Sequence, residues 1–434
     1  MANQQPEETI IAPPKVPQVY QIGNSLHLDW DELDLSMRFF KFHDQANGLT
    51  SEVWVKKTSN NAMYDSSRYT LTSVESKRKL AKLLQERFEL LEIDWLGLTI
   101  QAFTMVVNAY RVGEPTLELK ATKILKPLEY LIYPLLPKNV PTTLVADGGA
   151  GKSTLAILLC TLLLSAYNDE HNTLGLKMPD EPINCLYLDW ETDKDEIEHN
   201  LTRFKNGLGI DQDITLHYRR CWQPMGDDMD EIQQQVLKHK PNLIVIDNMA
   251  SATQTDLIGA DGATKLFTRD IRQLHCTTLL LTHHSKARAD EPSPIGSVMF
   301  KNYSRAVWFL KREKDSEINR MRIGLYCQKF NRSYLHKPLG FEFNYFEDEI
   351  RVHKMNISDS SDLAANLPMQ DRIKNMLSRK PQTSLELANQ FKLSEPTIKK
   401  ILSDHSDMFM MLGDNKWGVK SNMPSEVYRL KETI

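Results

Sequence analysis

Cysteine is scarce in this chain, and its five cysteines are scattered: Cys160, Cys185, Cys221, Cys276 and Cys327. Most of them lie in apolar runs typical of strands or helices, so we interpret them as reduced core residues of a cytosolic protein. This placement argues against a disulfide framework or a zinc site. Long apolar runs are also missing, because the longest, 155–164, has about half of the ~20 residues that a membrane span needs.

A strong net charge is absent as well. The chain has 53 basic and 57 acidic residues and a formal net charge of −4, which excludes a uniformly basic nucleic-acid-binding protein and leaves only local patches for such contacts. Residues 1–17 are polar and rich in proline, without the apolar run of a secretory signal. We therefore expect a cytoplasmic protein without a membrane partner, with two or three domains along its 434 residues.

The most informative stretch is 141–156, which predicts a short strand, a glycine-rich turn and an apolar helix opening at Lys152. Glycine lets the backbone N–H groups of the turn point at an anion, and the helix N-terminus adds its dipole. Lys152 should reach the β- and γ-phosphates of ATP, and the Ser153 hydroxyl should ligate Mg²⁺. Ala146 replaces the first glycine of the common pattern, while Gly148 and Gly149 keep the turn flexible. The expected nucleotide-binding residues are Asp147, Gly148, Gly149, Ala150, Gly151, Lys152, Ser153 and Thr154.

Acidic residues end two apolar strands that follow this motif. Asp247 ends the strand expected at 243–247, where a carboxylate can hold Mg²⁺ beside the phosphates. Glu191 follows the strand expected at 184–189 and is our candidate for the group that polarises the attacking water. Asp189 and Asp193 are competing candidates for that role.

A pair of histidines, His283 and His284, directly follows the apolar strand expected at 277–282. A polar residue at this position can sense the γ-phosphate and pass its state to the next loop. A metal site is disfavoured because no further ligand has suitable spacing.

The order of the elements divides the chain into five parts. Alternating strands and helices predict an α/β core with a parallel sheet, followed by a mostly antiparallel continuation from 306 to 353. Before the core, two strands at 51–57 and 68–72 and a helix at 73–84 indicate a small α+β domain. The basic residues of that helix indicate a solvated face, with phosphate contact as the alternative. The expected parts are a disordered tail (1–20), an N-terminal α+β accessory domain (21–120), the core (121–356), a polar linker (357–367) and a C-terminal domain (368–434).

The C-terminal part predicts helices at 369–377, 384–391 and 394–402 and a hairpin at 409–419 that turns at 413–415. This order is typical of a winged helix-turn-helix domain. Its third helix would be the recognition helix and carries Lys399 and Lys400.

These motifs together, with Ile246-Asp247-Asn248 and the segment 294–298 after the histidines, resemble the RecA-like hexameric ATPases, particularly the plasmid replicative helicase RepA and its relatives. The resemblance covers about 125–355. It implies a RecA-like P-loop NTPase core, a hexameric ring and translocation on single-stranded DNA. It also implies that Glu191 is the catalytic base and that His283 or His284 is the sensor.

The resemblance adds residues that act away from their own P-loop. The segment 328–332 is similar to the Lys/Arg pair that RecA- and DnaB-like ATPases insert into the neighbouring subunit's site, which makes Lys329 and Arg332 candidates and Arg305 a weaker one. The loops at 251–262 and 285–296 would face a central channel. There Lys286, Arg288 and Lys301 could hold a DNA backbone without reading its sequence.

Two functions follow as expectations. The first is an ATP-dependent, ring-forming DNA translocase or helicase acting on single-stranded DNA, in replication of a mobile element, plasmid or phage. The second is an ATP-switched regulator or loader in which the C-terminal domain recruits DNA or replication proteins. A recombinase filament is disfavoured, since the sequence shows no N-terminal polymerisation motif.

Overall fold

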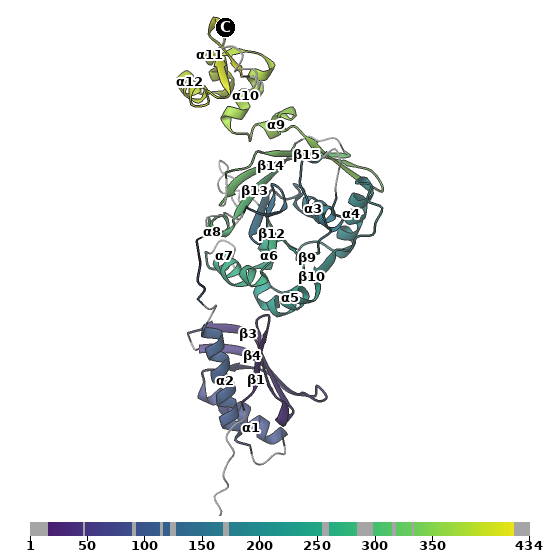
Figure 1. Ribbon diagram of the computed structural model, residues 1–434, viewed down its shortest axis with the longest axis vertical. Helices are drawn as coiled ribbons and strands as arrows, with labels where there is room; N and C mark the ends of the chain where they lie inside the picture. Colours follow the sequence, from purple (N-terminus) through teal and green to yellow (C-terminus); the bar gives the residue numbers. More distant parts are fainter. Residues whose placement is uncertain are drawn as a thin grey trace, which may run out of the picture.

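The computed structural model describes residues 16–46, 48–88, 93–112, 116–121, 127–167, 173–253, 260–283, 298–314, 318–331 and 334–420. The chain is elongated, with an N-terminal part, a large central part and a small C-terminal part that follow one another along the long axis (Figure 1). The described residues contain no helix with the length and apolar character needed to cross a lipid bilayer.

The central part is built on a nine-stranded sheet with the order β10-β9-β11-β12-β8-β13-β14-β15-β16. Pairing is parallel from β10 to β13 and antiparallel from β13 onward. The expected strands are all present, and β13 belongs to both halves because it runs parallel to β8 and antiparallel to β14. The strands are β8 (Pro141–Ala146), β9 (Cys185–Asp189), β10 (His217–Arg220), β11 (Leu243–Asp247), β12 (Thr277–His283), β13 (Ala306–Arg312), β14 (Arg320–Phe330), β15 (Leu339–Tyr345) and β16 (Ile350–Met355).

Helices cover both faces of this sheet, which explains why its parallel strands are continuous apolar runs. β11 shows the pattern, since Val245 packs in the cluster with the helices of one face and Ile244 and Ile246 pack in the cluster of the other. The first face carries α3 (Lys152–Leu164) and α4 (Lys194–Gly207). The second carries α5 (Met225–His239), α6 (Met249–Ala252) and the π-helix η2 (Leu266–Ile271). Shorter elements are β6 (Tyr130–Ile132), β7 (Leu136–Pro137), α7 (Ala260–Lys265), η3 (Arg272–Leu274) and α8 (Val298–Tyr303).

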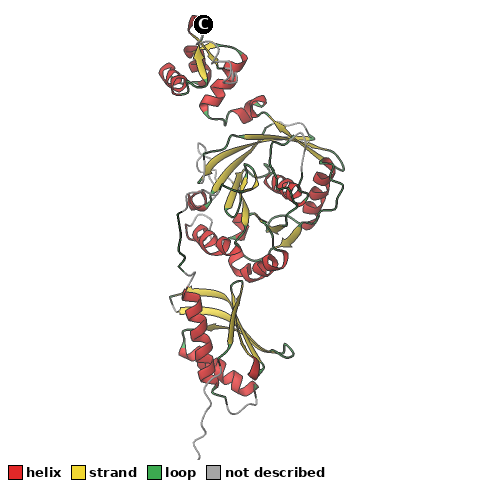
Figure 2. Cartoon of the chain, in the orientation of Figure 1, coloured by secondary structure: helices red, strands yellow, loops and turns green. Residues whose placement is uncertain are grey.

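The N-terminal part is a five-stranded antiparallel sheet in sequential order, with two helices packed against it (Figure 2). The expected strands and helix appear as β4 (Gly48–Lys57), β5 (Met63–Thr70) and α1 (Val74–Arg87), and the Ser73 side chain caps α1 as expected. Sequence reasoning missed β1 (Gln18–Ile22), β2 (Ser25–Trp30), η1 (Asp31–Leu33), β3 (Leu35–Gln45) and α2 (Trp95–Val112). The prediction of disorder up to residue 20 was wrong at its end, because β1 begins at Gln18 and pairs with β2.

The segment expected to be a polar linker is structured. It forms η4 (Ile357–Asp359) and α9 (Ser361–Ala364), and the buried side chains of Ile357 and Leu363 pack against β13 and β14. Tyr326 donates a hydrogen bond to the Leu363 carbonyl (2.5 Å). The linker prediction was wrong because a few apolar residues inside a polar segment are enough to hold it on the sheet.

The C-terminal part contains the helices and the hairpin that the sequence predicts. They are α10 (Met369–Arg379), α11 (Ser384–Phe391), α12 (Glu395–Asp404), β18 (Phe409–Met411), η5 (Gly413–Asn415) and β19 (Lys416–Val419). A short strand, β17 (Gln382–Thr383), pairs with β19 and completes a three-stranded sheet. Ser394 caps α12, and the side chains of Ile373, Leu387 and Ile398 form the core of this part.

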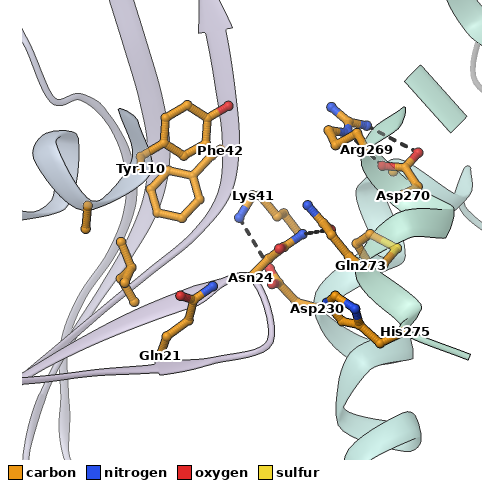
Figure 3. A pocket seen from close by; sticks show the side chains of 14 residues that line it. Gln21, Asn24, Lys41, Phe42, Tyr110, Asp230, Arg269, Asp270, Gln273 and His275 are labelled. Carbon is orange, nitrogen blue, oxygen red and sulfur yellow. Dashed lines mark hydrogen bonds and ion pairs between the residues drawn. The ribbon is translucent and has the colours of Figure 1, made fainter. Parts of the chain in front are cut away.

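The N-terminal sheet meets the central part at α5 and η3, beside a cleft of about 370 Å³ (Figure 3). The backbone N–H of Asn24 donates to the Gln233 side chain, and its own side-chain amide donates to Gln273. Gly23 allows this approach: its φ is +60°, and a Cβ there would lie 2.2 Å from Gln233 Oε1. Asp230 accepts hydrogen bonds from Ser25 Oγ (3.2 Å) and from the backbone of the β3 strand.

Candidate active site

The glycine-rich turn joins β8 to α3, as the sequence predicts. Gly149 and Gly151 have φ values of +68° and +99°, the left-handed region that favours glycine. No heavy atom lies within 4 Å of a Cβ built on Gly148 or Gly149, so the turn presents open backbone to a ligand. At Gly151 a Cβ would lie 3.0 Å from Met321 Cε on β14. The turn and the start of α3 therefore have the geometry of an anion-binding loop.

Ser153 and Asp247 meet beside this loop. Ser153 Oγ donates to Asp247 Oδ2 at 2.6 Å, and the buried Tyr187 hydroxyl donates to the same oxygen at 2.6 Å. Asp247 is fully buried, and its other oxygen, Oδ1, has no hydrogen-bond partner. Burial raises the pKa of Asp247, while the Ser153 and Tyr187 hydroxyls favour its charged form. A hydroxyl and a carboxylate with a spare buried oxygen fit the hard oxygen ligands that Mg²⁺ prefers.

Lys152 lies at the centre of the site. Its side chain is buried, and its Nζ donates to the Asp147 carbonyl (3.1 Å) and lies 3.2 Å from His283 Nδ1. Burial lowers the pKa of Lys152, against the attraction of Glu191 and Asp247. Burial also lowers the pKa of His283, and the positive charge of Lys152 adds to this effect. His283 is therefore a neutral ring at neutral pH, placed at the end of β12 where the sequence predicts a sensor.

Glu191 faces the same site from the turn that follows β9. His283 Nε2 lies 3.9 Å from Glu191 Oε2, and the Asn248 side chain donates to the same carboxylate. The Glu191 side chain is 43% exposed, so a water molecule can reach it. The structure thus brings Lys152, Ser153, Asp247, Glu191 and His283 together at one edge of the sheet.

The two competing acids have other contacts. Asp189 is fully buried and accepts hydrogen bonds from the backbone N–H groups of Glu191 and Thr192 (both 2.9 Å). It also accepts one from the Tyr218 hydroxyl (2.8 Å) and is paired with Arg220 (3.2 Å). Asp193 is the N-cap of α4. Asp189 is therefore a residue that holds the turn carrying Glu191.

Two side chains beside the P-loop were missed by sequence reasoning. Arg312, at the end of β13, donates to the Gly149 carbonyl (3.2 Å). Tyr345, at the end of β15, donates through its hydroxyl to Met321 Sδ (3.8 Å), and the Arg203 guanidinium lies over its ring at 5.6 Å. Only the pairing of β13, β14 and β15 beside β8 brings them there, and no local sequence signal marks them.

The remaining candidates do not join this site within one chain. Lys329 on β14 lies opposite Val307 on β13, and Val307 lies opposite Thr143 in the first half of β8. Lys329 is therefore at the end of the sheet away from the P-loop. Its Nζ donates to the carbonyls of Lys301 and Asn302 (both 2.7 Å). The backbone N–H of Arg305 likewise donates to Pro141, at the first residue of β8.

The other predicted residues lie on α12, on α8 or outside the described residues. On α12, Lys399 is paired with Glu395 (2.8 Å), and Lys400 is exposed. Lys301 lies on α8. His284, Lys286, Arg288 and Arg332 lie outside the described residues.

Comparisons with known proteins concern mainly the central part. Residues 112–289 match a family model described as an AAA domain. A comparison with curated proteins finds no match. Among solved structures, a KaiC-like protein of the hyperthermophilic archaeon Pyrococcus horikoshii is similar, with 16% identity over 52% of this chain and 100% of that chain and a TM-score of 0.36. The sheet order and the P-loop fit a RecA-like P-loop core, and residues 112–289 of this part are similar to an AAA domain.

Proposed function

We propose that this protein hydrolyses ATP at a site shared between the subunits of a ring, most simply a hexamer, and uses the energy to move along single-stranded DNA. The observation that carries the ATPase assignment is the cluster of Lys152, Ser153, Asp247 and Glu191 around an open glycine-rich turn. The helicase-type activity of the RepA kind rests on the sequence resemblance.

The residues of the site have separate tasks in this proposal. The loop and Lys152 bind the phosphates, which replace the Asp147 carbonyl and His283 as partners of Lys152. Ser153 and the spare oxygen of Asp247 would hold Mg²⁺, and the ion would supply positive charge beside the phosphates. Glu191, held by Asp189 and Asn248, accepts a proton from the attacking water. His283 contacts both Lys152 and Glu191, so it is placed to sense the γ-phosphate.

The position of Lys329 supports a site that needs a second subunit. It lies at the far end of the sheet from its own P-loop, so in this proposal it completes a neighbour's site, together with Arg332. Measuring the mass in solution, with and without a non-hydrolysable ATP analogue and a DNA oligomer, tests this arrangement. A monomer under all conditions contradicts the shared site.

Substitution of Lys152 by alanine tests the nucleotide site itself. Lys152→Ala should abolish ATP hydrolysis, because the charge that faces the β- and γ-phosphates is lost. Hydrolysis at the normal rate would show that the site is wrongly assigned. Stimulation of ATPase activity by single-stranded DNA and opening of a tailed duplex then test translocation.

A second function is favoured by the charge of the C-terminal part. We interpret α10 to α12 and the β17–β19 sheet as a winged helix-turn-helix domain, which can bind DNA or a protein. On its third helix, Lys399 forms an ion pair with Glu395, so of the two lysines only Lys400 has no ion-pair partner among the described residues. This favours an ATP-switched regulator or loader that recruits replication proteins, and ATPase activity without duplex opening would support it.

A further inference from the structure

The N-terminal sheet carries a row of aromatic and basic side chains that crosses its strands. The helices α1 and α2 pack against the face formed by residues such as Leu28, Met37 and Val53. On the opposite face the register aligns one residue from each successive strand. These are Tyr20 with His27, His27 with Arg38, Arg38 with Trp54, and Trp54 with Ser66.

The members of this row stack on one another. The rings of Tyr20 and His27 are 5.1 Å apart at an angle of 14°. The guanidinium of Arg38 lies 5.4 Å from the Trp54 ring centroid and 4.8 Å from that of Phe40. Neighbouring strands are about 4.8 Å apart, so the row offers planar groups at regular spacing across the sheet. We call this set of residues (Tyr20, His27, Arg38 and Trp54) the aromatic row.

The aromatic row is partly exposed to solvent. Tyr20 is 42% exposed, and His27, Arg38 and Trp54 are partly exposed. The ring of Phe40 is buried (4% exposed), and the Arg38 guanidinium covers it. A ligand can therefore reach part of each side chain of the row.

Basic side chains lie in the row and beside it, where they can hold phosphates. Glu52 is paired with both Lys41 (3.2 Å) and Arg68 (3.3 Å), which offset its charge, whereas Asp29 only accepts the Tyr20 hydroxyl (2.7 Å). Two cations have only neutral hydrogen-bond partners. Arg38 donates to Ser25 Oγ (3.0 Å), which in turn donates to the Asp230 carboxylate (3.2 Å), and Lys56 donates to Asn61 Oδ1 (2.9 Å).

We propose that the aromatic row binds single-stranded nucleic acid, with bases stacked on its rings and phosphates held by Arg38 and Lys56. Stacking on aromatic and guanidinium planes is tolerant of sequence, because every base has a π-face. Bases in a duplex are already stacked on one another, so the row selects single strands. This surface is separate from the ATP site, and its binding needs no nucleotide.

Fluorescence anisotropy with the full-length chain and no nucleotide tests the row. The probes are fluorescein-labelled oligodeoxythymidine, oligouridine and a blunt DNA duplex. At least one of the two single strands should bind more tightly than the duplex. Comparison of the DNA strand with the RNA strand then shows which of them is the ligand. Equal or tighter binding of the duplex, or no binding of single strands at low salt, overturns the proposal.

Substitutions in the aromatic row test whether it is the binding site. Trp54→Leu should weaken binding on the order of tenfold or more, since one stacking plane is lost, and Trp54→Phe should keep most of it. Arg38→Glu should weaken binding and reduce its salt dependence. The controls are Lys82→Glu on the exposed surface of α1 and Trp222→Leu, whose ring is 83% exposed in the central part. Both controls should bind within about twofold of the wild type.

A crosslinking measurement covers the case in which a variant fails to fold. Ultraviolet crosslinking of the wild-type chain to oligodeoxythymidine, followed by mass spectrometry, should place the adducts in peptides from β1 to β4. Adducts confined to the central part, or folded Trp54→Leu and Arg38→Glu variants that bind normally, contradict the proposal while leaving the ATPase assignment intact.

Discussion

Replacement of Asp189 by alanine should separate the positioning of Glu191 from the binding of ATP. Asp189 is fully buried and accepts the backbone N–H groups of Glu191 and Thr192, the Tyr218 hydroxyl and the Arg220 guanidinium. Asp189→Ala leaves these donors without their acceptor. The turn that carries Glu191 would then lose the contacts that fix its backbone.

The expected magnitudes follow from these contacts. Removing one partner of a buried charge pair costs about 3–5 kcal/mol in unfolding free energy. Since the Arg220 side chain is 30% exposed, water can replace part of its contact, and we expect the lower end of that range. A displacement of Glu191 by about 1 Å should lower kcat on the order of a hundredfold. The nucleotide affinity should change little, because Lys152 and the glycine-rich turn remain.

Three measurements on the Asp189→Ala variant test this reasoning. Urea unfolding gives the stability, titration with a fluorescent ATP analogue gives the affinity, and steady-state phosphate release gives kcat. Asp193→Ala is the matched control, because it removes a neighbouring carboxylate that only caps α4. A folded Asp189→Ala variant with wild-type kcat would refute the positioning role.

Other perturbations test further contacts of the site. The pKa of His283 in the folded chain is lowered from 6.5 by burial and by Lys152, so the unfolded chain binds the proton first as the pH falls. The free energy of unfolding should therefore decrease below about pH 6.5. His283→Gln should remove this part of the pH dependence, as measured by urea unfolding at several pH values. Gly151→Ala should weaken ATP binding in the same titration, because the left-handed φ of +99° is strained for alanine and Met321 lies 3.0 Å from the new Cβ. Lys329→Ala should lower kcat by about 10³ or more without loss of ATP binding. Mixing this variant with Lys152→Ala subunits should restore part of the activity, because a site can then combine Lys152 of one subunit with Lys329 of its neighbour. No recovery in mixed oligomers would argue against a shared site.

The sequence predicts the central sheet well because its strands are buried on both faces. β11 is an uninterrupted apolar run that ends in Asp247, and such runs are recognisable without any tertiary information. The P-loop is equally local, since its turn, lysine and serine are consecutive. Glu191 and His283 were predicted because they lie at or just past the ends of buried strands, where parallel sheets gather their polar groups.

The missed features depend on long-range pairing. Arg312 and Tyr345 reach the P-loop only because β13 pairs with β8 and the antiparallel strands continue from it. The N-terminal strand β1 is exposed at every position, so it lacks the alternation that marks a half-buried strand. The role of Asp189 was hidden for a related reason, since a carboxylate at a strand end looks the same whether it reacts or holds a turn.

The most direct test of the central claim is ATP hydrolysis by the Glu191→Gln variant, measured beside its affinity for ATP. Glutamine keeps the size of the side chain and its contact with Asn248 but cannot accept a proton from water. We predict that the variant binds ATP with Mg²⁺ as the wild type does and that its turnover is lost. Turnover at the wild-type rate would contradict the assignment of this edge of the sheet as the catalytic site.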